Sequence, residues 1–263
     1  MARMIFYGLF VTQQKYQLVL AYDGTHFEGW QSRRDGRGVR HEIEKAVVAL
    51  FGICLEIESS SRTDAGVHAM GQSLHVVVPV KTSCLPARQL RAALNAQLPE
   101  DIRVMRARVV PSTFHARFDA VAKEYRYHIH QGDVMPPQLR QECWHIAHDL
   151  DIVAMQKAAQ ALTGRYDFQH FTVRRKGELL DSHRTLIDCR VIKKGARITI
   201  RIVGDGFLYK MCRRIVGTLI QVGEGKLTVS QVEEWLQSPT PQPGGFVAPA
   251  HGLTLWSVRY PNT

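Results

Sequence analysis

The stretch Ser59-Ser60-Ser61-Arg62-Thr63-Asp64-Ala65-Gly66-Val67-His68-Ala69 separates two apolar, strand-like segments of the chain. Asp64 lies at its centre, two residues after Arg62 and just before an Ala-Gly pair. Glycine gives a turn the freedom that lets a bulky ligand approach the backbone, so this stretch can present the Asp64 carboxylate to a ligand. The other interpretation is a structural turn in which the Asp64 side chain bonds its own backbone.

The segments on either side of this stretch predict one α+β half. Alternating apolar residues predict strands at 16–22, 53–58, 72–78 and 102–110. Helical spacing predicts one helix at 39–51, which ends at Gly52, and a second helix that begins at Pro86. The resulting order is β-α-β-β-α-β, and Asp64 falls between its second and third strands.

The second half of the chain predicts the same order of elements. Strands are expected at 118–129, 185–192, 197–203 and 253–260, and helices at 152–162, 208–220 and 229–236. We therefore predict an α+β fold of two similar β-α-β-β-α-β halves, which share a central mixed, mainly antiparallel sheet with helices on its outer face and a basic cleft across it. The expected divisions are an N-terminal extension at 1–14, a first half at 15–112 and a second half at 113–263.

The charge balance favours a polyanionic partner. The 263 residues include 34 Lys and Arg against 24 Asp and Glu, which gives a formal charge of +10. A surface of this sign attracts nucleic acid or an anionic membrane. Because no stretch approaches the ~20 apolar residues that a membrane-spanning helix needs, we expect nucleic acid and no membrane partner.

The cysteine pattern excludes some structural classes, and the motifs that the sequence lacks exclude some classes of reaction. Five cysteines are scattered through the chain and never occur at Cys-x-x-Cys spacing, which argues against a disulfide framework or a zinc knuckle and favours a cytoplasmic protein. The sequence has no Gly-rich phosphate loop, no Ser-His-Asp set and no dinucleotide fingerprint. We therefore expect a reaction that needs neither a metal nor a nucleotide cofactor.

Asp64 and two arginines can serve chemistry on a nucleic acid. Asp64 is a candidate nucleophile or base, and an arginine such as Arg62 or Arg213 would keep a carboxylate ionised in a partly dry cleft. The other interpretation of Arg213 is a surface arginine near the start of a helix. Residue type and spacing leave both open.

The segment Lys123–His130 carries aromatic and basic residues in alternation. Period two places Tyr125, Tyr127 and Ile129 on one strand face, and Arg126, His128 and His130 on the other. An aromatic face beside a basic one suits base stacking near phosphates, whereas the simpler alternative is two core tyrosines backed by a solvated face. The two histidines have no acidic or cysteine partner nearby in sequence, so we expect satisfied or exposed histidines rather than metal ligands.

Three other aromatic residues are open to simpler interpretations. Trp30, in a loop after the first strand, either lines a site or packs against the first sheet. Phe168 and Phe171 are predicted to lie in the core on their spacing.

Taken together, these residues resemble the TruA-type tRNA pseudouridine synthases from about Lys15 to Pro261. Six blocks carry the resemblance in order: Tyr22-Asp23-Gly24 with Phe27, Gly29, Trp30 and Gln31; Arg62 to Ala69; Phe114 with Ala116-Arg117, Ala120, Lys123, Tyr125 and Tyr127; Asp167-Phe168 with Phe171; Met211 with Arg213 and Val216-Gly217; and Pro249-Ala250 with Gly252-Leu253. Six spaced blocks in register make the resemblance specific.

The resemblance implies a role for each candidate residue. Asp64 would be the catalytic aspartate, Tyr125 the aromatic ring stacked on the target uracil, and Arg213 the basic partner of the aspartate. Arg62 would help to hold the flipped-out nucleotide, and Leu253 would belong to the substrate-binding residues. The implied reaction is the isomerisation of uridine to pseudouridine in the anticodon stem-loop of tRNA, at tRNA positions 38 to 40, by a homodimer without a cofactor.

The sequence departs from the family pattern at two places. Ser61 occupies a position that is commonly glycine, and the segment after Trp30-Gln31 reads Ser32-Arg33-Arg34 and then Val39-Arg40 where the family tends to carry glutamines. We expect these changes to affect the choice of uridine and tRNA more than the reaction. Two rival functions are an RNA-binding protein of this fold without catalysis, and the same chemistry on another RNA.

Overall fold

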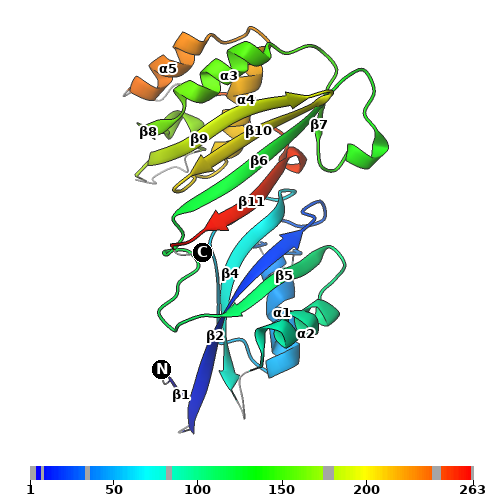
Figure 1. Cartoon of the computed structure of the whole chain (residues 1–263), viewed down its shortest axis with the longest axis vertical. Coiled ribbons are helices and arrows are strands. Elements are labelled where there is room, and N and C mark those ends of the chain that lie inside the picture. Colours follow the sequence, from blue (N-terminus) through cyan, green and yellow to red (C-terminus); the bar gives the residue numbers. More distant parts are fainter. Residues whose placement is uncertain are drawn as a thin grey trace. The chain divides into compact units, whose positions relative to one another are not determined.

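The computed structural model of the chain describes residues 4–6, 9–32, 36–80, 85–173, 181–238 and 244–261. The chain forms two compact units. The first unit contains residues 1–121 and 255–263, and the second contains residues 122–254. Each unit is an α+β structure with a mainly antiparallel sheet and its own helices (Figure 1). The predicted α+β class is confirmed.

The sheet of the first unit is built around β2 (Leu9–Tyr22). This strand pairs antiparallel with β4 (His68–Val80) on one side and with β5 (Ile102–Val109) on the other, so that Tyr16 lies opposite both Val76 and Val109. The short strands β1 (Met4–Phe6) and β3 (Glu56–Ser59) pair antiparallel with β2 and β4 respectively. Strand β11 (Leu253–Arg259) brings residues 255–259 into this unit.

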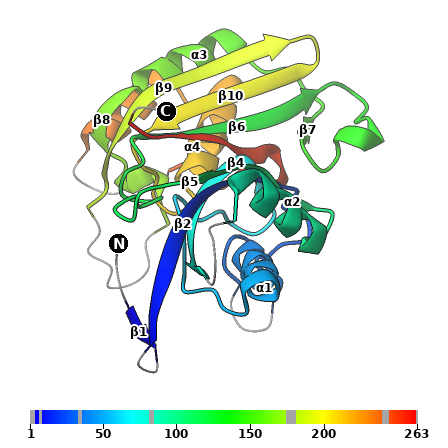
Figure 2. The ribbon, with the colours of Figure 1, turned by 60° about the horizontal axis from the view of Figure 1, so that its bottom comes forward.

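Two helices, α1 (Val39–Phe51) and α2 (Ala87–Gln97), pack against each other and against this sheet (Figure 2). The buried side of α1 consists of Val39, Ile43, Ala46 and Val47, and that of α2 of Leu90 and Leu94. Burying each large aliphatic side chain contributes about 1.5 to 3 kcal/mol. As predicted, α1 ends at Gly52, which adopts the left-handed conformation that glycine accepts without strain.

The sheet of the second unit has the strand order β6-β10-β9-β8, all antiparallel. These strands are β6 (Ala122–Gln131), β10 (Arg197–Gly204), β9 (His183–Lys194) and β8 (Gly164–Asp167). The short β7 (Trp144–Ile146) runs parallel to β6. Three helices complete the unit: α3 (Ile152–Ala161), which packs on β9, α4 (Met211–Gly223) and α5 (Val229–Gln237).

Short 3₁₀ turns connect several of these elements: η1 (Pro137–Leu139), η2 (Gln169–Phe171) and η3 (Ala250–Gly252). Phe168 precedes η2 and Phe171 is its last residue. Both rings are fully buried and contact each other edge to face, with ring centroids 5.7 Å apart. The expectation that both rings belong to the core is confirmed.

Several predicted boundaries need correction. The strand predicted at 118–129 begins only at Ala122, because residues 115–119 close a turn in which the amide of His115 donates to Asp119 Oδ2 and the amide of Asp119 donates to the carbonyl of His115. The helix predicted at 208–220 begins at Met211, because Lys210 has a φ of 60° and cannot continue a right-handed helix. Strand β2 begins earlier than predicted, and β1, β7 and β8 were not predicted.

Among the described residues, none of the helices combines the length and apolar character needed to traverse a lipid bilayer.

Candidate active site

The loop between β3 and β4 carries Asp64 at the surface of the first unit. Asp64 is half-buried, Arg62 is exposed, and Thr63 between them is buried. The amide of Val67 donates a hydrogen bond to the carbonyl of Asp64 at 3.2 Å, which closes the turn. The loop therefore holds the Asp64 backbone in a fixed turn while its carboxylate remains partly accessible.

A second loop, residues 23–31 after β2, fastens the Asp64 loop on both sides. The amide of Trp30 donates to the carbonyl of Thr63 at 3.1 Å, and the amide of Gly66 donates to the carbonyl of Phe27 at 3.2 Å. Further along, the amide of Gly24 donates to Nδ1 of His68 at 3.0 Å. Two blocks that lie far apart in the sequence thus form one hydrogen-bonded pair of loops.

Two glycines of the second loop, Gly24 and Gly29, allow its backbone to lie close to the backbone of the Asp64 loop. A Cβ atom on Gly29 would lie 2.5 Å from the carbonyl oxygen of Thr63 and 3.0 Å from the carbonyl carbon of Asp64, and the φ of Gly29 is +99°. A Cβ atom on Gly24 would lie 2.2 Å from the carbonyl oxygen of Val67. Both contacts are with backbone, which cannot move aside cheaply, so these positions need glycine.

A buried polar network supports the Asp64 loop from below. The Tyr22 hydroxyl lies 2.9 Å from Thr63 Oγ1, and both side chains are buried. The fully buried Gln72 donates from Nε2 to the carbonyl of Ser61 at 2.7 Å and accepts from Ser60 Oγ at 3.0 Å. Burial raises the pKa of Tyr22, so its hydroxyl stays protonated. A satisfied network of this kind holds the backbone before Asp64 in one position.

Trp30 packs inside the first unit. Only 2% of its surface is exposed, and its carbonyl accepts from the amide of Arg40 at 2.9 Å in the first turn of α1. This burial agrees with the interpretation of Trp30 as a packing residue, although Trp30 also belongs to the lining of a hollow at the start of α1.

Tyr125, Arg213 and Leu253 lie in the second unit. Tyr125 is in β6, is 5% exposed, and meets Phe207 edge to face with ring centroids 5.1 Å apart. Arg213 lies in the first turn of α4 and is half-buried. Its Nε donates to the carbonyl of Ala248 at 2.7 Å, and the amide of Ala248 donates back to the carbonyl of Arg213 at 3.1 Å. Leu253 is buried at the start of β11.

The segment 244–252 lies directly on α4 and β6. A Cβ atom on Gly217 of α4 would lie 1.9 Å from the carbonyl oxygen of Phe246, and one on Gly252 would lie 2.5 Å from Cζ of Tyr127. Tyr127 is fully buried and donates its hydroxyl to the carbonyl of Pro249 at 2.9 Å, because burial raises its pKa and keeps it protonated. Tyr127 therefore has a structural role in holding this segment.

The polar side of β6 is partly neutralised. The buried Glu124 accepts from Arg126 Nε at 2.8 Å and from Arg201 at 3.0 Å, and Arg201 also pairs with Asp188. Burial, together with nearby arginines, lowers the pKa of His128 to about 4, so this histidine is neutral at pH 7. The residues expected to form a basic face are in part paired or uncharged.

The candidate residues thus fall into two sets. Asp64 and Arg62 share a loop of the first unit, whereas Tyr125, Arg213 and Leu253 lie in the second. The pairing of Asp64 with Arg213 stays a prediction.

Comparison with known proteins identifies the family. The model of a family described as tRNA pseudouridine synthase matches residues 18–119 and 158–261, which include Arg62, Asp64, Arg213 and Leu253, whereas Tyr125 falls between the two matched ranges. The chain is 40% identical over 247 residues to a tRNA pseudouridine synthase A of Exiguobacterium sp., a match that covers 94% of this chain and 98% of that protein. The chain belongs to the tRNA pseudouridine synthase family.

Other relatives extend the match over nearly the whole of the chain. The tRNA pseudouridine synthase A of Anoxybacillus flavithermus is 39% identical, with 95% of this chain and 100% of that protein covered, and that of Bacillus subtilis is 39% identical, with 92% and 98% covered. This chain is therefore an RNA pseudouridine synthase, an isomerase. The predicted family is confirmed.

Sequence reasoning on this pseudouridine synthase missed Gln72 and Thr63 as supports of the Asp64 loop. Gln72 belongs to a strand that was predicted from its apolar alternation, and only its full burial shows that its amide serves the loop. A polar residue at an inward position of an apolar strand is the signal that would have indicated such a network.

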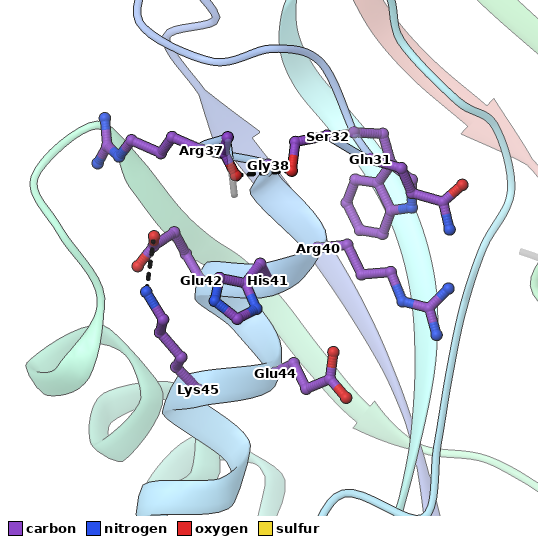
Figure 3. A pocket seen from close by; sticks show the side chains of 11 residues that line it. Gln31, Ser32, Arg37, Gly38, Arg40, His41, Glu42, Glu44 and Lys45 are labelled. Atoms are coloured by element: carbon purple, nitrogen blue, oxygen red, sulfur yellow. Dashed lines mark hydrogen bonds and ion pairs between the residues drawn. The ribbon is translucent and has the colours of Figure 1, made fainter. Parts of the chain in front are cut away.

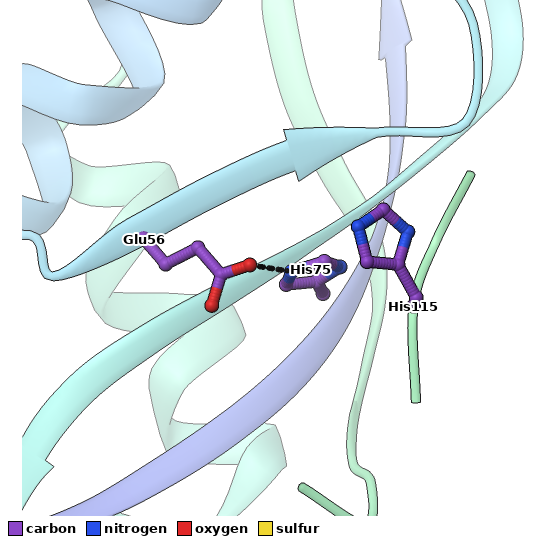
Figure 4. Close-up of side chains that lie close together, drawn as sticks. All are labelled: Glu56, His75 and His115. Atoms are coloured by element: carbon purple, nitrogen blue, oxygen red, sulfur yellow. Dashed lines mark hydrogen bonds and ion pairs between the residues drawn. The ribbon is translucent and has the colours of Figure 1, made fainter. Parts of the chain in front are cut away.

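Glu56, His75 and His115 form a cluster of possible metal ligands in the first unit (Figure 4). His75 is fully buried, its Nδ1 accepts from the amide of Ala116 at 3.0 Å, and its Nε2 lies 2.8 Å from Glu56 Oε1. A neutral His75 therefore carries its proton on Nε2 and donates it to Glu56, and burial lowers its pKa in keeping with a neutral ring. A metal at Nε2 would need a proton on Nδ1, where the Ala116 amide already points. The cluster fits a hydrogen-bonded pair better than a metal site.

A hollow of about 800 Å³ lies at the start of α1 (Figure 3). Its basic side chains include Arg37 and Lys45, but Arg37 pairs with Asp101 at 2.6 Å and Lys45 with Glu42 at 3.3 Å. Glu44 adds a further negative charge to the lining. The lining is thus mixed in charge, and Asp64 is not part of it.

Proposed function

We propose that this protein converts uridine to pseudouridine in the anticodon stem-loop of tRNA, with Asp64 as the catalytic aspartate. The observation that carries the proposal is the paired-loop geometry around Asp64. Backbone hydrogen bonds from Trp30 and Gly66, and a contact at Gly29 that leaves no room for a Cβ atom, hold the backbone that carries Asp64 in one place. A catalytic group whose position is fixed before the substrate binds can act on one atom of a large substrate with little loss of entropy.

The reaction exchanges one bond of the uracil for another. The N1–C1′ bond breaks, the detached ring turns in the site, and C5 forms a bond to C1′. C5 loses its proton and N1 gains one, so the product is an isomer of the substrate. Breaking the glycosidic bond leaves C1′ short of electrons, and the Asp64 carboxylate would relieve this by attack at C1′ or by assisting proton removal.

The other candidate residues have complementary roles. Tyr125 would stack on the uracil and is a candidate for accepting the C5 proton, while Arg213 would keep Asp64 ionised and oriented. Arg62, exposed on the Asp64 loop, would help to hold the flipped-out nucleotide, and Leu253 would line the site. Extruding a uridine costs a few kcal/mol and least where the RNA is already looped, which supports the anticodon stem-loop and its uridines as the target.

Release of tritium from tRNA labelled at C5 of uridine tests the proposal directly. A pseudouridine synthase releases one tritium for each uridine converted, whereas an RNA-binding protein without catalysis releases none. We also propose that the protein is cytoplasmic and that its active form is a homodimer. The mass of the purified protein in solution checks the homodimer independently of activity.

The replacement of Tyr125 by leucine should remove most of the activity and leave the protein folded. Leucine fills much of the space but cannot stack on a uracil, and the loss of the edge-to-face contact with Phe207 costs about 1 kcal/mol beyond the change in buried area. The measurement is the rate of tritium release, with the unfolding midpoint in urea as the check on folding. Tyr125→Phe is the matched control for the hydroxyl. A full rate in Tyr125→Leu would remove this residue from the site.

The affinity for tRNA should fall steeply with salt. The formal charge of +10 makes phosphate contacts the main source of affinity, and each neutralised phosphate adds about 0.7 to 0.9 to the slope of log affinity against log salt. Binding of total tRNA measured between low and moderate salt should therefore give a slope of several units. A flat dependence would mean that the positive charge serves another purpose.

A further inference from the structure

Phe118 is the most exposed large aromatic side chain among the described residues. It lies in the loop between β5 and β6, and 76% of its surface is exposed. Full burial of a phenylalanine contributes about 1.5 to 3 kcal/mol, which the folded chain forgoes here. Single exposed apolar residues are common on surfaces, so exposure alone indicates nothing. The surroundings of Phe118 are what distinguish it.

The loop that carries Phe118 is held in place on several sides. The amide of Ala116 donates to the buried His75, and the carbonyl of Ala116 accepts from the Tyr260 hydroxyl at 2.7 Å. The carbonyl of Phe114 accepts from Lys15 Nζ at 3.0 Å, and its ring packs on Tyr260 with centroids 5.2 Å apart. The chain thus presents Phe118 on a fixed segment, which lowers the entropy cost of binding a ligand there.

His115 supports one face of the Phe118 ring. The two ring centroids are 4.3 Å apart and the planes are inclined by 34°, which is close to stacking. Nδ1 of His115 accepts from the amides of Arg117 and Phe118 at 3.2 and 3.3 Å, so the imidazole cannot rotate freely. On its other side His115 meets the buried His75 edge to face at 4.9 Å (Figure 4). A series of rings therefore connects the interior to the exposed Phe118.

Arg117 places a positive charge beside Phe118. The Arg117 guanidinium carbon lies 5.8 Å from the centre of the Phe118 ring, and Arg117 is exposed. The nearby carboxylate of Asp119 is occupied by the amide of His115 at 2.9 Å. An apolar ring with a guanidinium 5.8 Å above its centre matches a planar group attached to an anion. In a nucleic acid that group is an unpaired base and the anion is its phosphate.

We infer that Phe118, supported by His115 and flanked by Arg117, is a stacking platform for an unpaired base of the tRNA. The ring of an extruded or looped nucleotide covers the exposed face of Phe118, and Arg117 meets the adjoining phosphate. Stacking on aromatic rings tolerates any base, so the platform contributes affinity and placement of the RNA without reading its sequence. The inference rests on tRNA as the substrate class and not on the chemistry assigned to Asp64.

The test compares Phe118→Ala and Phe118→Trp with the unchanged chain in binding to total tRNA and to a fully paired RNA duplex. Phe118→Ala should weaken tRNA binding about tenfold and duplex binding by less than twofold, whereas Phe118→Trp should retain affinity for tRNA. The tryptophan introduced at this position should lose fluorescence when tRNA is added, measured against the signal of the four native tryptophans. Because most of the side chain is exposed, Phe118→Ala should lose no more than the contact with His115, about 1 kcal/mol, and the protein should stay folded.

Two controls separate the platform from other effects. Val134 is also 76% exposed, and Val134→Ala should leave tRNA affinity unchanged. Arg117→Gln should reduce the salt slope of binding by about one unit, while Phe118→Ala should leave the slope unchanged because it removes no phosphate contact. These readouts measure binding, so they hold even if the protein releases no tritium and the proposed function fails.

Equal affinity of Phe118→Ala and the unchanged chain for tRNA would overturn the inference. An equal loss for the duplex would also overturn it, since a stacking platform needs an unpaired base. A change in the mass of the protein in solution caused by Phe118→Ala would assign the ring to a contact between copies of the chain instead.

Discussion

Replacement of Asp64 by asparagine is expected to lower the rate of tritium release by more than about 10³-fold. Asparagine keeps the size of the side chain but removes the charge, and a neutral amide neither attacks C1′ nor accepts a proton from the substrate. The backbone hydrogen bonds of the loop, which involve Thr63, Asp64 and Gly66, are made by amide and carbonyl groups and are kept in the asparagine variant. Binding of tRNA should therefore stay within a few-fold of that of the unchanged chain.

Asp133→Asn is the matched control for this change. Asp133 is an exposed carboxylate of the second unit, so the same isosteric replacement there removes one negative charge without touching the Asp64 loop. Its rate of tritium release should equal that of the unchanged chain. Normal turnover in Asp64→Asn would refute the role assigned to Asp64.

The second large effect is expected from Gly29→Ala. The new methyl group would lie 2.5 Å from the carbonyl oxygen of Thr63, and the φ of +99° is one that alanine rarely adopts. Both loops must shift to relieve the contact, and the shift moves Asp64. We expect the free energy of unfolding to fall by about 2 to 4 kcal/mol and the rate of tritium release per folded molecule to fall at least tenfold.

Gly52→Ala is the control that separates the backbone strain of a positive φ from the steric contact between the two loops. The φ of Gly52 is +79°, and a Cβ atom there would meet nothing within 4 Å. This variant should lose about 1 to 2 kcal/mol of stability, measured by urea unfolding, with unchanged turnover per folded molecule. If Gly29→Ala lost stability but kept its full rate, the paired loops would be structural and would not position Asp64.

The order of the elements could be predicted from the sequence because the periodic spacing of apolar residues ends where a glycine terminates the helix. Helix α1, for example, buries Val39, Ile43 and Val47 and ends at Gly52 as the spacing predicts. The errors occurred where a local interaction overrides the period. Residues 118–121 alternate like a strand, but the turn from His115 to Asp119 excludes them from the sheet, and the left-handed Lys210 delays the start of α4.

The site was predicted in its residues but not in its supports. Asp64 was indicated by a turn between strands and by the family pattern, both of which are local in sequence. The contacts that fix it join Thr63 to Tyr22 and Ser61 to Gln72, and no periodicity reveals that these pairs meet. The same holds for Arg213, whose side chain bonds the carbonyl of Ala248 across a long gap in sequence.

The departure at Ser61 has a structural explanation. Among the described residues, Lys210 is the only non-glycine residue with a positive φ, so Ser61 has an ordinary backbone conformation and does not require glycine. Its carbonyl oxygen accepts from Gln72 and from Ser59 Oγ, and any residue at this position supplies that carbonyl. Serine at this position therefore leaves the Asp64 loop intact. The second departure falls partly on residues 33–35, outside the described part of the chain, while Arg40 lines the hollow at α1 (Figure 3).

A map of pseudouridine in total tRNA after treatment with the purified protein, and with its Asp64→Asn form, tests the central claim most directly. The account predicts new pseudouridine at uridines of the anticodon stem-loop with the unchanged chain and none with Asp64→Asn. Pseudouridine formed by Asp64→Asn at the rate of the unchanged chain would contradict it.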